Sequence, residues 1–473
     1  MTTPRTAHLI GICGTGMGSL AGLLKEAGFL VRGSDQDVYP PISTMLETLR
    51  IPVLKGYRAE NLDPVPDVIV VGNIVGRKNP EVQALLARGL PYMSMPQALA
   101  EFVLAGRHPV VVAGTHGKTT TSALMSHVLL AAGRDPSFLV GGVLIGSERS
   151  YRLGSGPHVV VEGDEYETAF FDKGPKLLHY LPRTAILTSV EYDHAEMFSS
   201  IEAVEEAFRQ FVAIVPPDGA VIACADDPRA ARLARHARAR TILYGIDDGE
   251  LRGSEISSGA AGMTFEIVTN DPPQVASPSS KASRFTVPMT GRHNLRNTIA
   301  VIAAARILGL GDLEIATALA SFRGVHRRQE IVGEAAGVTV LDDFAHHPTA
   351  VRETIAGTRS RFPGRRLWAL FEPRTNTTRH SVFQEEYALA FDGADRVVIT
   401  AVDHPERAPE GSRFDVEKLV AALRHRGLDA RYVPTVSEIV SMVASEAREG
   451  DVVLVMSNGA FGGVHRRILD ALR

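Results

Sequence analysis

A glycine-containing stretch near the end of the first quarter of the chain has the residue types of a phosphate-binding loop. It reads HPVVVAGTHGKTTTSALMSHVLLAAG, from His108 to Gly133. A β-branched run enters the loop and a helical pattern leaves it. Such a loop exposes backbone N–H groups at a helix N-terminus, where the helix dipole adds positive charge. We therefore predict a nucleoside triphosphate cradle, formed by Gly114, Thr115, His116, Gly117, Lys118, Thr119 and Thr120.

Two side chains of this loop predict specific contacts. The ammonium of Lys118 can reach β- and γ-phosphate oxygens, and the hydroxyl of Thr119 can coordinate Mg²⁺. The usual pattern has a glycine where this chain has Val112, so the loop is a shorter variant. A chance Gly-Lys-Thr turn is the alternative, and the strand before the loop and the helix after it argue against it.

A second glycine-rich turn, HLIGICGTGMGSLAG, lies near the start of the chain. Its glycines sit between a strand and a helix, and Asp35 closes the next strand, as in a dinucleotide-binding fingerprint. Glycines in such turns also serve close packing, and this alternative stays open. An NAD(P)-dependent oxidoreductase would explain this turn but not the triphosphate loop. Two nucleotide sites fit better if ATP is the energy source and the substrate carries a nucleotide diphosphate.

Two acidic clusters follow apolar runs of the middle region. VVVEGDEYE contains Glu162, Asp164 and Glu165, and SVEYDHAEMF contains Glu191, Asp193 and His194. Mg²⁺ prefers a few carboxylates together with phosphate oxygens and water. We expect both clusters at the ends of parallel strands, facing the cradle. Solvated loop acids are the alternative, and His194 could be either a metal ligand or a loop residue.

Three further motifs contain polar side chains that suit nucleotide binding and catalysis. In GRHNLRN, the amides of Asn294 and Asn297 suit an adenine edge or helix capping equally. HRRQE offers an arginine pair that is either an anion clamp or a surface feature. DDFAHHP packs four titratable groups into six residues, more than a simple turn needs. The residues of the last two motifs are Arg327, Arg328, Asp342, Asp343, His346 and His347.

The elements that must position these residues alternate along the chain. Ala7–Cys13, Phe29–Asp35 and Pro66–Gly72 are predicted strands, and Gly18–Gly28 is a predicted helix. The alternation restarts at His108 and again near Val325, which favours parallel sheets. Asn270–Ser283 is rich in Pro and Ser and predicts a surface loop. Gly291–Gly309 predicts a long helix.

We therefore predict an α/β protein of three domains. Residues 1–107 form a Rossmann-like N-terminal domain, 108–325 a central domain with a P-loop ATPase-type parallel sheet, and 326–473 a Rossmann-like C-terminal domain.

Composition limits the class of protein. The chain has 473 residues, of which 45% are hydrophobic and 22% charged, as in ordinary soluble proteins. A net charge of −4 gives no general attraction to nucleic acid or to an anionic membrane. Two cysteines exclude a disulfide framework. The start lacks a signal-peptide core, and no run approaches ~20 apolar residues. We expect a cytoplasmic enzyme.

Taken together and in this order, the motifs resemble those of the Mur ligases, the ATP-dependent amide-forming enzymes of peptidoglycan assembly. The motifs are GTHGKTTT, EGDE, EYDH, GRHNLRN, the RR before QE, and DDFAHHP. The resemblance covers the whole chain. It implies ATP and Mg²⁺ as cofactors and UDP-N-acetylmuramate as a substrate, activated as an acyl phosphate.

The resemblance also implies residue roles. Lys118 would contact the terminal phosphates, and Asn294 and Asn297 would lie along the nucleotide. Arg328 and Asp343 would complete the ATP site from the C-terminal domain. Either Asp343 or His346 would accept the proton of the attacking amine. The implied magnesium ligands are Thr119, Glu162 and His194, and the implied substrate-binding residues are Gly14, Thr15, Gly16, Met17, Asp35 and Arg374.

The acceptor follows from finer similarities, in stretches such as EPRTNT and VMSNGAFGGVH. They resemble the branch that joins UDP-N-acetylmuramate to the free tripeptide L-alanyl-γ-D-glutamyl-meso-diaminopimelate in cell-wall recycling. The branch that adds L-alanine is the alternative. Some members carry a carbamylated lysine near the metal, but no lysine occurs here between Lys176 and Lys281. This absence favours the branches that use UDP-N-acetylmuramate itself.

Overall fold

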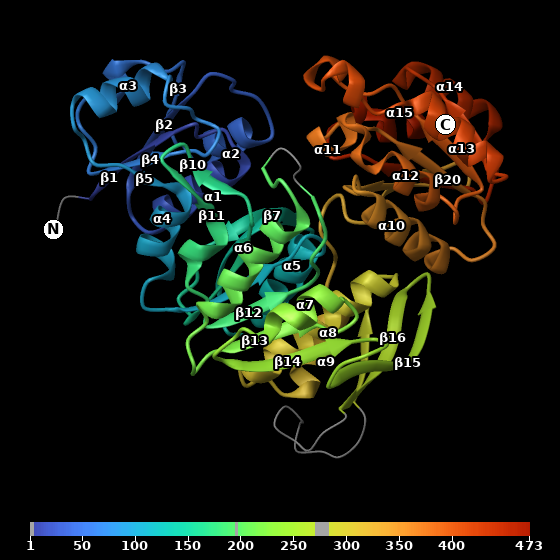
Figure 1. The fold of residues 1–473 in the computed structure, drawn as a ribbon, viewed down its shortest axis with the longest axis horizontal. Helices are drawn as coiled ribbons and strands as arrows, with labels where there is room; N and C mark the ends of the chain where they lie inside the picture. Colours follow the sequence, from blue (N-terminus) through green and yellow to red (C-terminus); the bar gives the residue numbers. More distant parts are fainter. Residues whose placement is uncertain (1–3, 194–196, 270–282) are drawn as a thin grey trace.

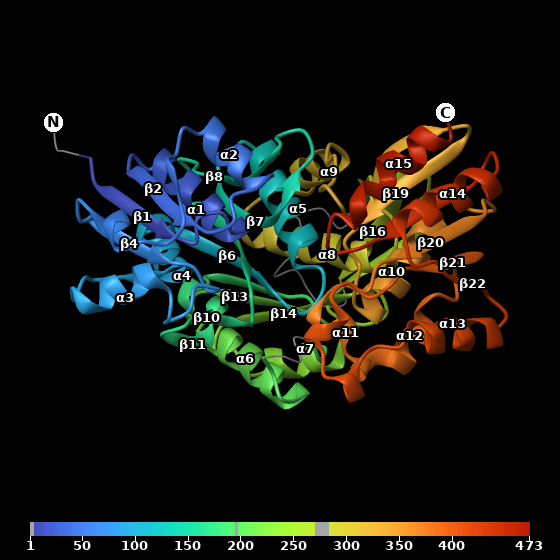
Figure 2. The same cartoon turned by 90° about the horizontal axis from the view of Figure 1, so that it is seen from above.

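Short apolar runs followed by helices build three separate sheets along this chain. The computed structural model describes residues 4–193, 197–269 and 283–473. Each sheet is the centre of one α/β domain (Figure 1). The N-terminal and C-terminal domains lie at opposite ends of the molecule, with the central domain between them (Figure 2). The predicted class, three α/β domains with parallel sheets, is confirmed.

The N-terminal sheet is parallel throughout, with strand order β3-β2-β1-β4-β5. The predicted strand at Ala7–Cys13 ends early, because Gly11 turns into the left-handed region at φ 83° and its N–H donates to Ser34 O. The elements are β1 (Thr6–Ile10), α1 (Thr15–Glu26), β2 (Leu30–Asp35), α2 (Ile42–Thr48), β3 (Val53–Lys55), β4 (Val68–Val71), α3 (Pro80–Ala87), β5 (Met93–Ser94) and α4 (Met95–Leu99).

The central sheet has the order β17-β16-β15-β14-β13-β12-β6-β9-β7-β8. Its middle strands, from β14 to β7, are parallel, so their carboxyl ends share one edge. Its strands are β6 (His108–Ala113), β7 (Ser137–Leu144), β8 (Arg149–Arg152), β9 (His158–Gly163), β12 (Thr184–Leu187), β13 (Ala220–Cys224), β14 (Arg240–Gly245), β15 (Leu251–Gly259), β16 (Gly262–Thr269) and β17 (Ser283–Val287). Its helices are α5 (Lys118–Ala131), α6 (Ile201–Ala213), α7 (Pro228–Ala234), α8 (Arg292–Ile307) and α9 (Asp312–Ala320).

A small hairpin, β10 (Glu167–Ala169) and β11 (Asp172–Pro175), stands apart from the main sheet. Its tip reaches the N-terminal domain, where the ring of Phe171 meets Tyr92 edge-on at 4.8 Å between ring centroids. Of the predicted loop at Asn270–Ser283, residues 270–282 lie outside the described residues, and Ser283 begins β17.

The C-terminal sheet has the order β18-β19-β23-β20-β21-β22, in which only β18 is antiparallel to its neighbour. Its strands are β18 (Glu330–Ala335), β19 (Val338–Asp343), β20 (Leu367–Phe371), β21 (Arg396–Ile399), β22 (Asp429–Tyr432) and β23 (Val452–Met456). Its helices are α10 (Pro348–Arg361), α11 (Asn376–Arg379), α12 (Gln384–Ala390), α13 (Val416–His425), α14 (Val436–Glu446) and α15 (Val464–Ala471).

The domain boundaries predicted at residues 107 and 325 fall between these sheets. The last strand of the N-terminal sheet ends at Ser94, and the C-terminal sheet begins at Glu330. The exact boundaries stay predictions.

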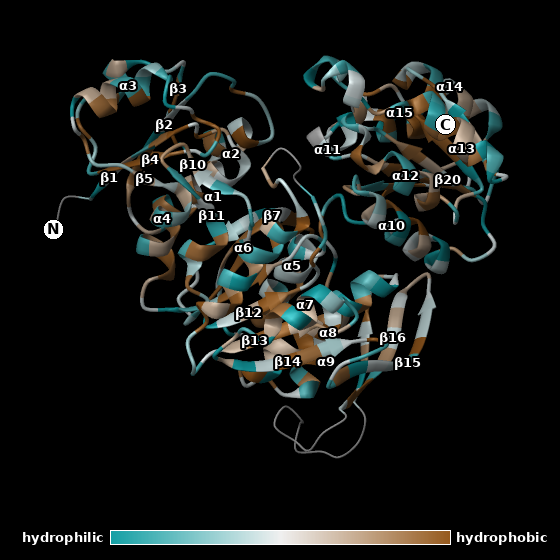
Figure 3. Cartoon of the chain, viewed as in Figure 1, coloured by the Kyte–Doolittle hydropathy of each residue, from teal (hydrophilic) through white to brown (hydrophobic). Residues whose placement is uncertain are grey.

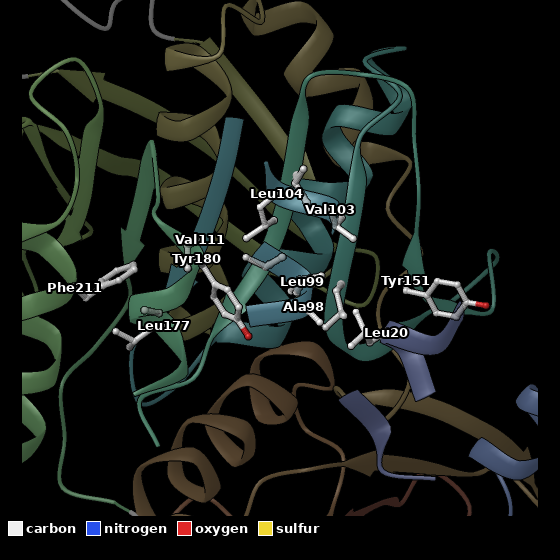
Figure 4. Close-up of a cluster of buried hydrophobic side chains, with 14 of the residues drawn as sticks. Leu20, Ala98, Leu99, Val103, Leu104, Val111, Tyr151, Leu177, Tyr180 and Phe211 are labelled. Atoms are coloured by element: carbon white, nitrogen blue, oxygen red, sulfur yellow. The ribbon is translucent and has the colours of Figure 1, made fainter. Parts of the chain in front are cut away.

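Hydrophobic residues are concentrated along the strands, while the helices carry both hydrophobic and hydrophilic residues (Figure 3). One buried cluster is shared by the N-terminal and central domains, since Leu20 and Leu99 belong to the same cluster as Val111 and Tyr180 (Figure 4). Burying apolar surface of both domains together fixes their relative position. Among the described residues, no helix is long and apolar enough to cross a membrane.

Helix α1 meets the central domain at a close approach. A Cβ placed on Gly22 would lie 2.1 Å from Cζ of Tyr151, which is 3% exposed. Beside this contact, the hydroxyls of Ser19 and Ser150 are 3.0 Å apart.

We predict that Gly22→Ala destabilises the protein. In an exposed helix the same change normally raises the free energy of unfolding by about 1 kcal/mol, because alanine has a higher helix propensity than glycine. Overpacking against Tyr151 costs about 1–3 kcal/mol. Chemical denaturation of Gly22→Ala, Tyr151→Ala and the double variant measures the coupling between the two positions. If the alanine stabilised the chain in the presence of Tyr151, the proposed close contact would be wrong.

Candidate functional site

The predicted cradle connects β6 to α5 at the carboxyl edge of the central sheet. Gly114 and Gly117 have φ values of 131° and 83°, which other residues rarely adopt. The loop is held by the segment after the neighbouring strand β12, because Thr115 N donates to Ser189 O at 2.9 Å. A Cβ on Gly114 would lie 2.2 Å from Thr188 Oγ1. Packing and backbone geometry therefore both require glycine there.

Lys118 is the first residue of α5, and its ammonium lies at the mouth of the loop. Its Nζ donates to Gly114 O at 2.8 Å and to Glu165 Oε2 at 2.9 Å. Burial alone would lower the pKa of Lys118, but the charges of Glu165 and Asp164 outweigh it and raise that pKa. The site therefore holds a full positive charge at the mouth of the loop.

Glu162, near the end of β9, lies beside the start of α5. Its Oε1 accepts from Gly141 N at 2.8 Å and from Ser122 Oγ at 3.0 Å, and Thr119 Oγ1 lies 3.4 Å from its Oε2. Burial, followed by the charge of Asp164, raises the pKa of Glu162. A carboxylate held in this way is stabilised by a bound cation.

Arg328 reaches this site from the chain that leads into the C-terminal sheet. Its Nη2 donates to Thr119 Oγ1 at 3.1 Å, and its guanidinium lies over the ring of Phe344, 4.8 Å from the centroid. A second positive charge is thus fixed near Lys118 by the C-terminal domain.

Asp343 supports this arrangement through the backbone. Its carboxylate accepts from Gln329 N and Ala345 N, both at 2.8 Å, and from Thr354 Oγ1 at 3.3 Å. Both oxygens are engaged by the C-terminal domain itself, and burial raises the pKa of Asp343. Its predicted role at the ATP stays a prediction, and its contacts position the residue next to Arg328.

The amides of α8 lie against the loop. A Cβ on Gly117 would lie 2.5 Å from Asn297 Oδ1. Asn294 Nδ2 donates to Thr290 O at 2.9 Å, and Asn297 Nδ2 lies 3.4 Å from Asn294 Oδ1. The two amides are buried, and their predicted contact with the nucleotide stays a prediction. Thr120 is also buried, at 7% exposure.

The two histidines of DDFAHHP face different partners. His346 Nδ1 lies 3.0 Å from Phe344 O, a carbonyl that can only accept, so the Nδ1 carries the proton. Burial lowers the pKa of His346 and keeps the ring neutral. His347 lies near Glu191 of the central domain, with Nδ1 3.7 Å from Oε2. His194, a predicted metal ligand, lies outside the described residues.

The imidazole of His116 points to the carboxylate of Glu191 and not into the cradle. Its Nε2 lies 3.1 Å from Glu191 Oε2, which also accepts from Thr349 Oγ1 at 2.8 Å. Hydrogen bonds to His116 and Thr349 outweigh burial and lower the pKa of Glu191 to about 2.

The glycine-rich turn of the N-terminal domain is built round Asp35. Asp35 Oδ2 accepts from Cys13 N at 2.8 Å, and Oδ1 accepts from Gln36 N at 2.8 Å and from Tyr57 OH at 3.1 Å. Its carboxylate therefore holds the turn in shape. Gly14 precedes Thr15, Gly16 and Met17, which begin α1. Their contact with a substrate stays a prediction.

Arg374 belongs to a separate polar cluster at the carboxyl edge of the C-terminal sheet. Its Nε lies 3.6 Å from Asp403 Oδ2, and its side chain lies against Gly459. Glu372 accepts from Ser457 Oγ at 2.5 Å beside it. Burial raises the pKa of Glu372.

Several contributors had no sequence signal. Ser122, Gly141 and Thr349 hold the carboxylates through contacts that no local motif predicts. Glu165 belongs to the predicted acidic cluster, but its pairing with Lys118 depends on the adjacency of β6 and β9.

A cradle, a held carboxylate and an arginine from a second domain are the geometry of a nucleotide-dependent ligase. The sequence matches three family descriptions in order: "Mur ligase family, catalytic domain" at residues 6–107, "Mur ligase middle domain" at 112–305 and "Mur ligase, glutamate ligase domain" at 327–459. The chain belongs to the Mur ligase family, and the predicted resemblance is confirmed.

Individual relatives refine this assignment. The chain is 39% identical over 468 residues, 98% of both chains, to the UDP-N-acetylmuramate–L-alanyl-γ-D-glutamyl-meso-2,6-diaminoheptandioate ligase of Escherichia coli. It is 35% identical to the UDP-N-acetylmuramate–L-alanine ligase of a Bradyrhizobium, covering 96% of this chain and 94% of the relative. A crystal structure of a murein peptide ligase from Psychrobacter arcticus is similar with a TM-score of 0.71 and 34% identity, covering 99% and 98% of the two chains.

We predict that Asp343→Ala lowers the free energy of unfolding by about 2–5 kcal/mol, because two buried N–H groups lose their acceptor. Asp343→Asn keeps one acceptor oxygen and should cost about 1–2 kcal/mol. Asp392→Ala, which removes an exposed ion pair with Arg426, is the matched control and should cost under about 1 kcal/mol. Equal urea midpoints for Asp343→Ala and the control would contradict this positioning role.

Proposed function

We propose that the protein joins UDP-N-acetylmuramate to the free tripeptide L-alanyl-γ-D-glutamyl-meso-diaminopimelate, using ATP. One observation carries the chemistry: Arg328 of the C-terminal domain donates to Thr119, beside Lys118 at the start of α5. A site completed by two domains suits a reaction that must keep water out. The full-length similarity to the Escherichia coli ligase supports the choice of substrates.

The reaction forms an amide from a carboxylate. A lactyl carboxylate oxygen attacks the γ-phosphorus of ATP, and ADP leaves with the electrons of the broken P–O bond. The resulting acyl phosphate is attacked at its carbonyl carbon by the amine of the tripeptide. The tetrahedral intermediate then expels phosphate and leaves the amide.

Lys118 and Arg328 supply the charge stabilisation in this scheme. Phosphate oxygens gain negative charge as ADP leaves, and fixed positive groups stabilise that charge without reorganising. Lys118 donates to ATP in exchange for its present contact with the carbonyl of Gly114. The ring of Phe344 keeps the guanidinium of Arg328 in place.

The oxygens of Thr119 and Glu162 fit a magnesium ion. Mg²⁺ prefers oxygen ligands in octahedral geometry at about 2.0–2.1 Å, which places neighbouring ligands about 3 Å apart. Thr119 Oγ1 and Glu162 Oε2 are 3.4 Å apart at the helix start. Bound there, Mg²⁺ would neutralise phosphate charge. We propose His194 as a further ligand, as the family resemblance implies.

For the proton of the amine, we favour His346 over Asp343. His346 is neutral with its proton on Nδ1, so Nε2 has a free lone pair for a base. Both oxygens of Asp343 already accept backbone N–H groups.

The N-terminal turn is the site we propose for the diphosphate of the UDP-sugar. Backbone N–H groups at the start of α1 suit an anion, and α1 packs on the central domain that binds ATP. Asp35 is committed to the turn, which leaves it poorly placed to bind a ribose and disfavours the oxidoreductase alternative.

The acceptor peptide is placed at the cluster around Arg374 in this proposal. Arginine and carboxylate side chains at one sheet edge suit a peptide that carries both carboxylates and amines. L-alanine as the acceptor is the alternative, because the L-alanine-adding relatives are also similar over nearly the whole chain.

We predict that Lys118→Ala slows ATP-dependent phosphate release by about 100- to 1,000-fold. Because this change breaks the ion pair between Lys118 and the buried Glu165, Lys118→Met combined with Glu165→Gln is a second variant that preserves packing. Lys173→Ala is the matched control, since Lys173 is an exposed lysine paired with Glu167. Full activity in both Lys118 variants would refute the proposed phosphate contact.

Phosphate release measured with UDP-N-acetylmuramate against a panel of acceptors identifies the peptide. The proposal predicts release with the tripeptide and little with L-alanine. Release with L-alanine alone would assign the chain to the alternative acceptor.

A further inference from the structure

The mechanism above leaves one half-buried cluster of metal-ligating side chains unused. His116 of the cradle, Glu191 after β12 and His347 after β19 bring their ligand atoms within 4.8 Å of one another. Two of these residues belong to the central domain and one to the C-terminal domain. The imidazole rings of His116 and His347 are 4.7 Å apart between centroids.

The donor set indicates which ion would suit this cluster. Magnesium prefers an all-oxygen set, whereas two imidazoles with one carboxylate suit zinc and similar transition metals. Zinc–nitrogen bonds of about 2.0–2.1 Å put tetrahedral ligands roughly 3.3–3.5 Å apart. Glu191 Oε2 lies 3.1 Å from His116 Nε2 and 3.7 Å from His347 Nδ1. Small side-chain shifts would complete the geometry.

We propose that His116, Glu191 and His347 bind one divalent transition-metal ion of the zinc type, which bridges the central and C-terminal domains beside the magnesium site.

Neighbouring residues form hydrogen bonds and ring contacts with the three proposed ligands, and such contacts orient the ligands in metal sites. Thr349 Oγ1 donates to the carboxylate of Glu191 at Oε2, at 2.8 Å, and the backbone N–H of Glu191 donates to Thr115 Oγ1 at 2.9 Å, so one contact orients the carboxylate and the other holds the main chain. His116 N donates to Ser189 Oγ at 3.0 Å. The side chain of His347 is 5% exposed and its ring packs edge-on against Phe383.

The protonation states also favour a metal. Burial, with the nearby His116, lowers the pKa of His347 to about 4, so this ring is neutral at pH 7. Its Nδ1 accepts a long hydrogen bond of 3.3 Å from Thr349 N at the start of α10, and a bound ion would take the place of this contact. Glu191 stays ionised, because its pKa is lowered to about 2.

Binding of Co²⁺ tests this site directly, because tetrahedral Co²⁺ has a strong visible absorption. The full-length protein is titrated with Co²⁺ in excess Mg²⁺, which occupies the oxygen site. We expect one tight tetrahedral site per chain. His116→Gln and Glu191→Gln should remove it, and Thr349→Val should weaken it by about 10- to 100-fold.

Two variants serve as controls. Glu162→Gln alters the magnesium site and should keep the cobalt absorption. His425→Gln, at the exposed end of α13, removes a histidine elsewhere and should also keep it. Circular dichroism checks that each variant is folded.

Equal cobalt binding by wild type, His116→Gln and Glu191→Gln would overturn the proposal, as would loss of the signal in His425→Gln. The absorption reports metal binding without turnover. Loss of ligation with intact cobalt binding would therefore contradict the proposed function alone.

Discussion

The structure depends on one buried positive charge, the ammonium of Lys118, held between the carbonyl of Gly114 and the carboxylate of Glu165. An unpaired charge at this depth would be costly, so the acid from the next strand is as necessary as the lysine. The left-handed glycines Gly114 and Gly117 give the loop beside this lysine its shape. The loop, the helix start and the acidic strand end therefore form one electrostatic unit.

Parallel strand order is what assembles this unit from distant segments. β12, β6 and β9 are neighbours in the central sheet, so the residues that follow each strand meet at one edge. The C-terminal domain adds Arg328 from outside this sheet, and Asp343 fixes the backbone beside it. A site divided between domains in this way suits the proposed reaction, whose acyl phosphate must be kept from water.

Much of this arrangement could be predicted from the sequence, because its signals are local. Glycine, lysine and threonine after a β-branched run predicted the loop, and repeated strand–helix alternation predicted three α/β domains. Contacts set by tertiary packing could not be predicted. His116 belongs to the predicted phosphate cradle, and its ring points to Glu191; Asp35 belongs to the predicted dinucleotide-type turn, and its carboxylate holds that turn in shape. Glu191 lies 75 residues beyond His116, and Cys13 and Tyr57 each lie 22 residues from Asp35, so these contacts have no signal in the local sequence.

The most direct test of the account follows oxygen from the substrate carboxylate. UDP-N-acetylmuramate labelled with heavy oxygen in its lactyl carboxylate is incubated with ATP and the tripeptide, and the released phosphate is analysed by mass spectrometry. If the cradle presents the γ-phosphate to that carboxylate, one labelled oxygen passes into each phosphate. Phosphate released without the label, while the amide forms, would contradict the account.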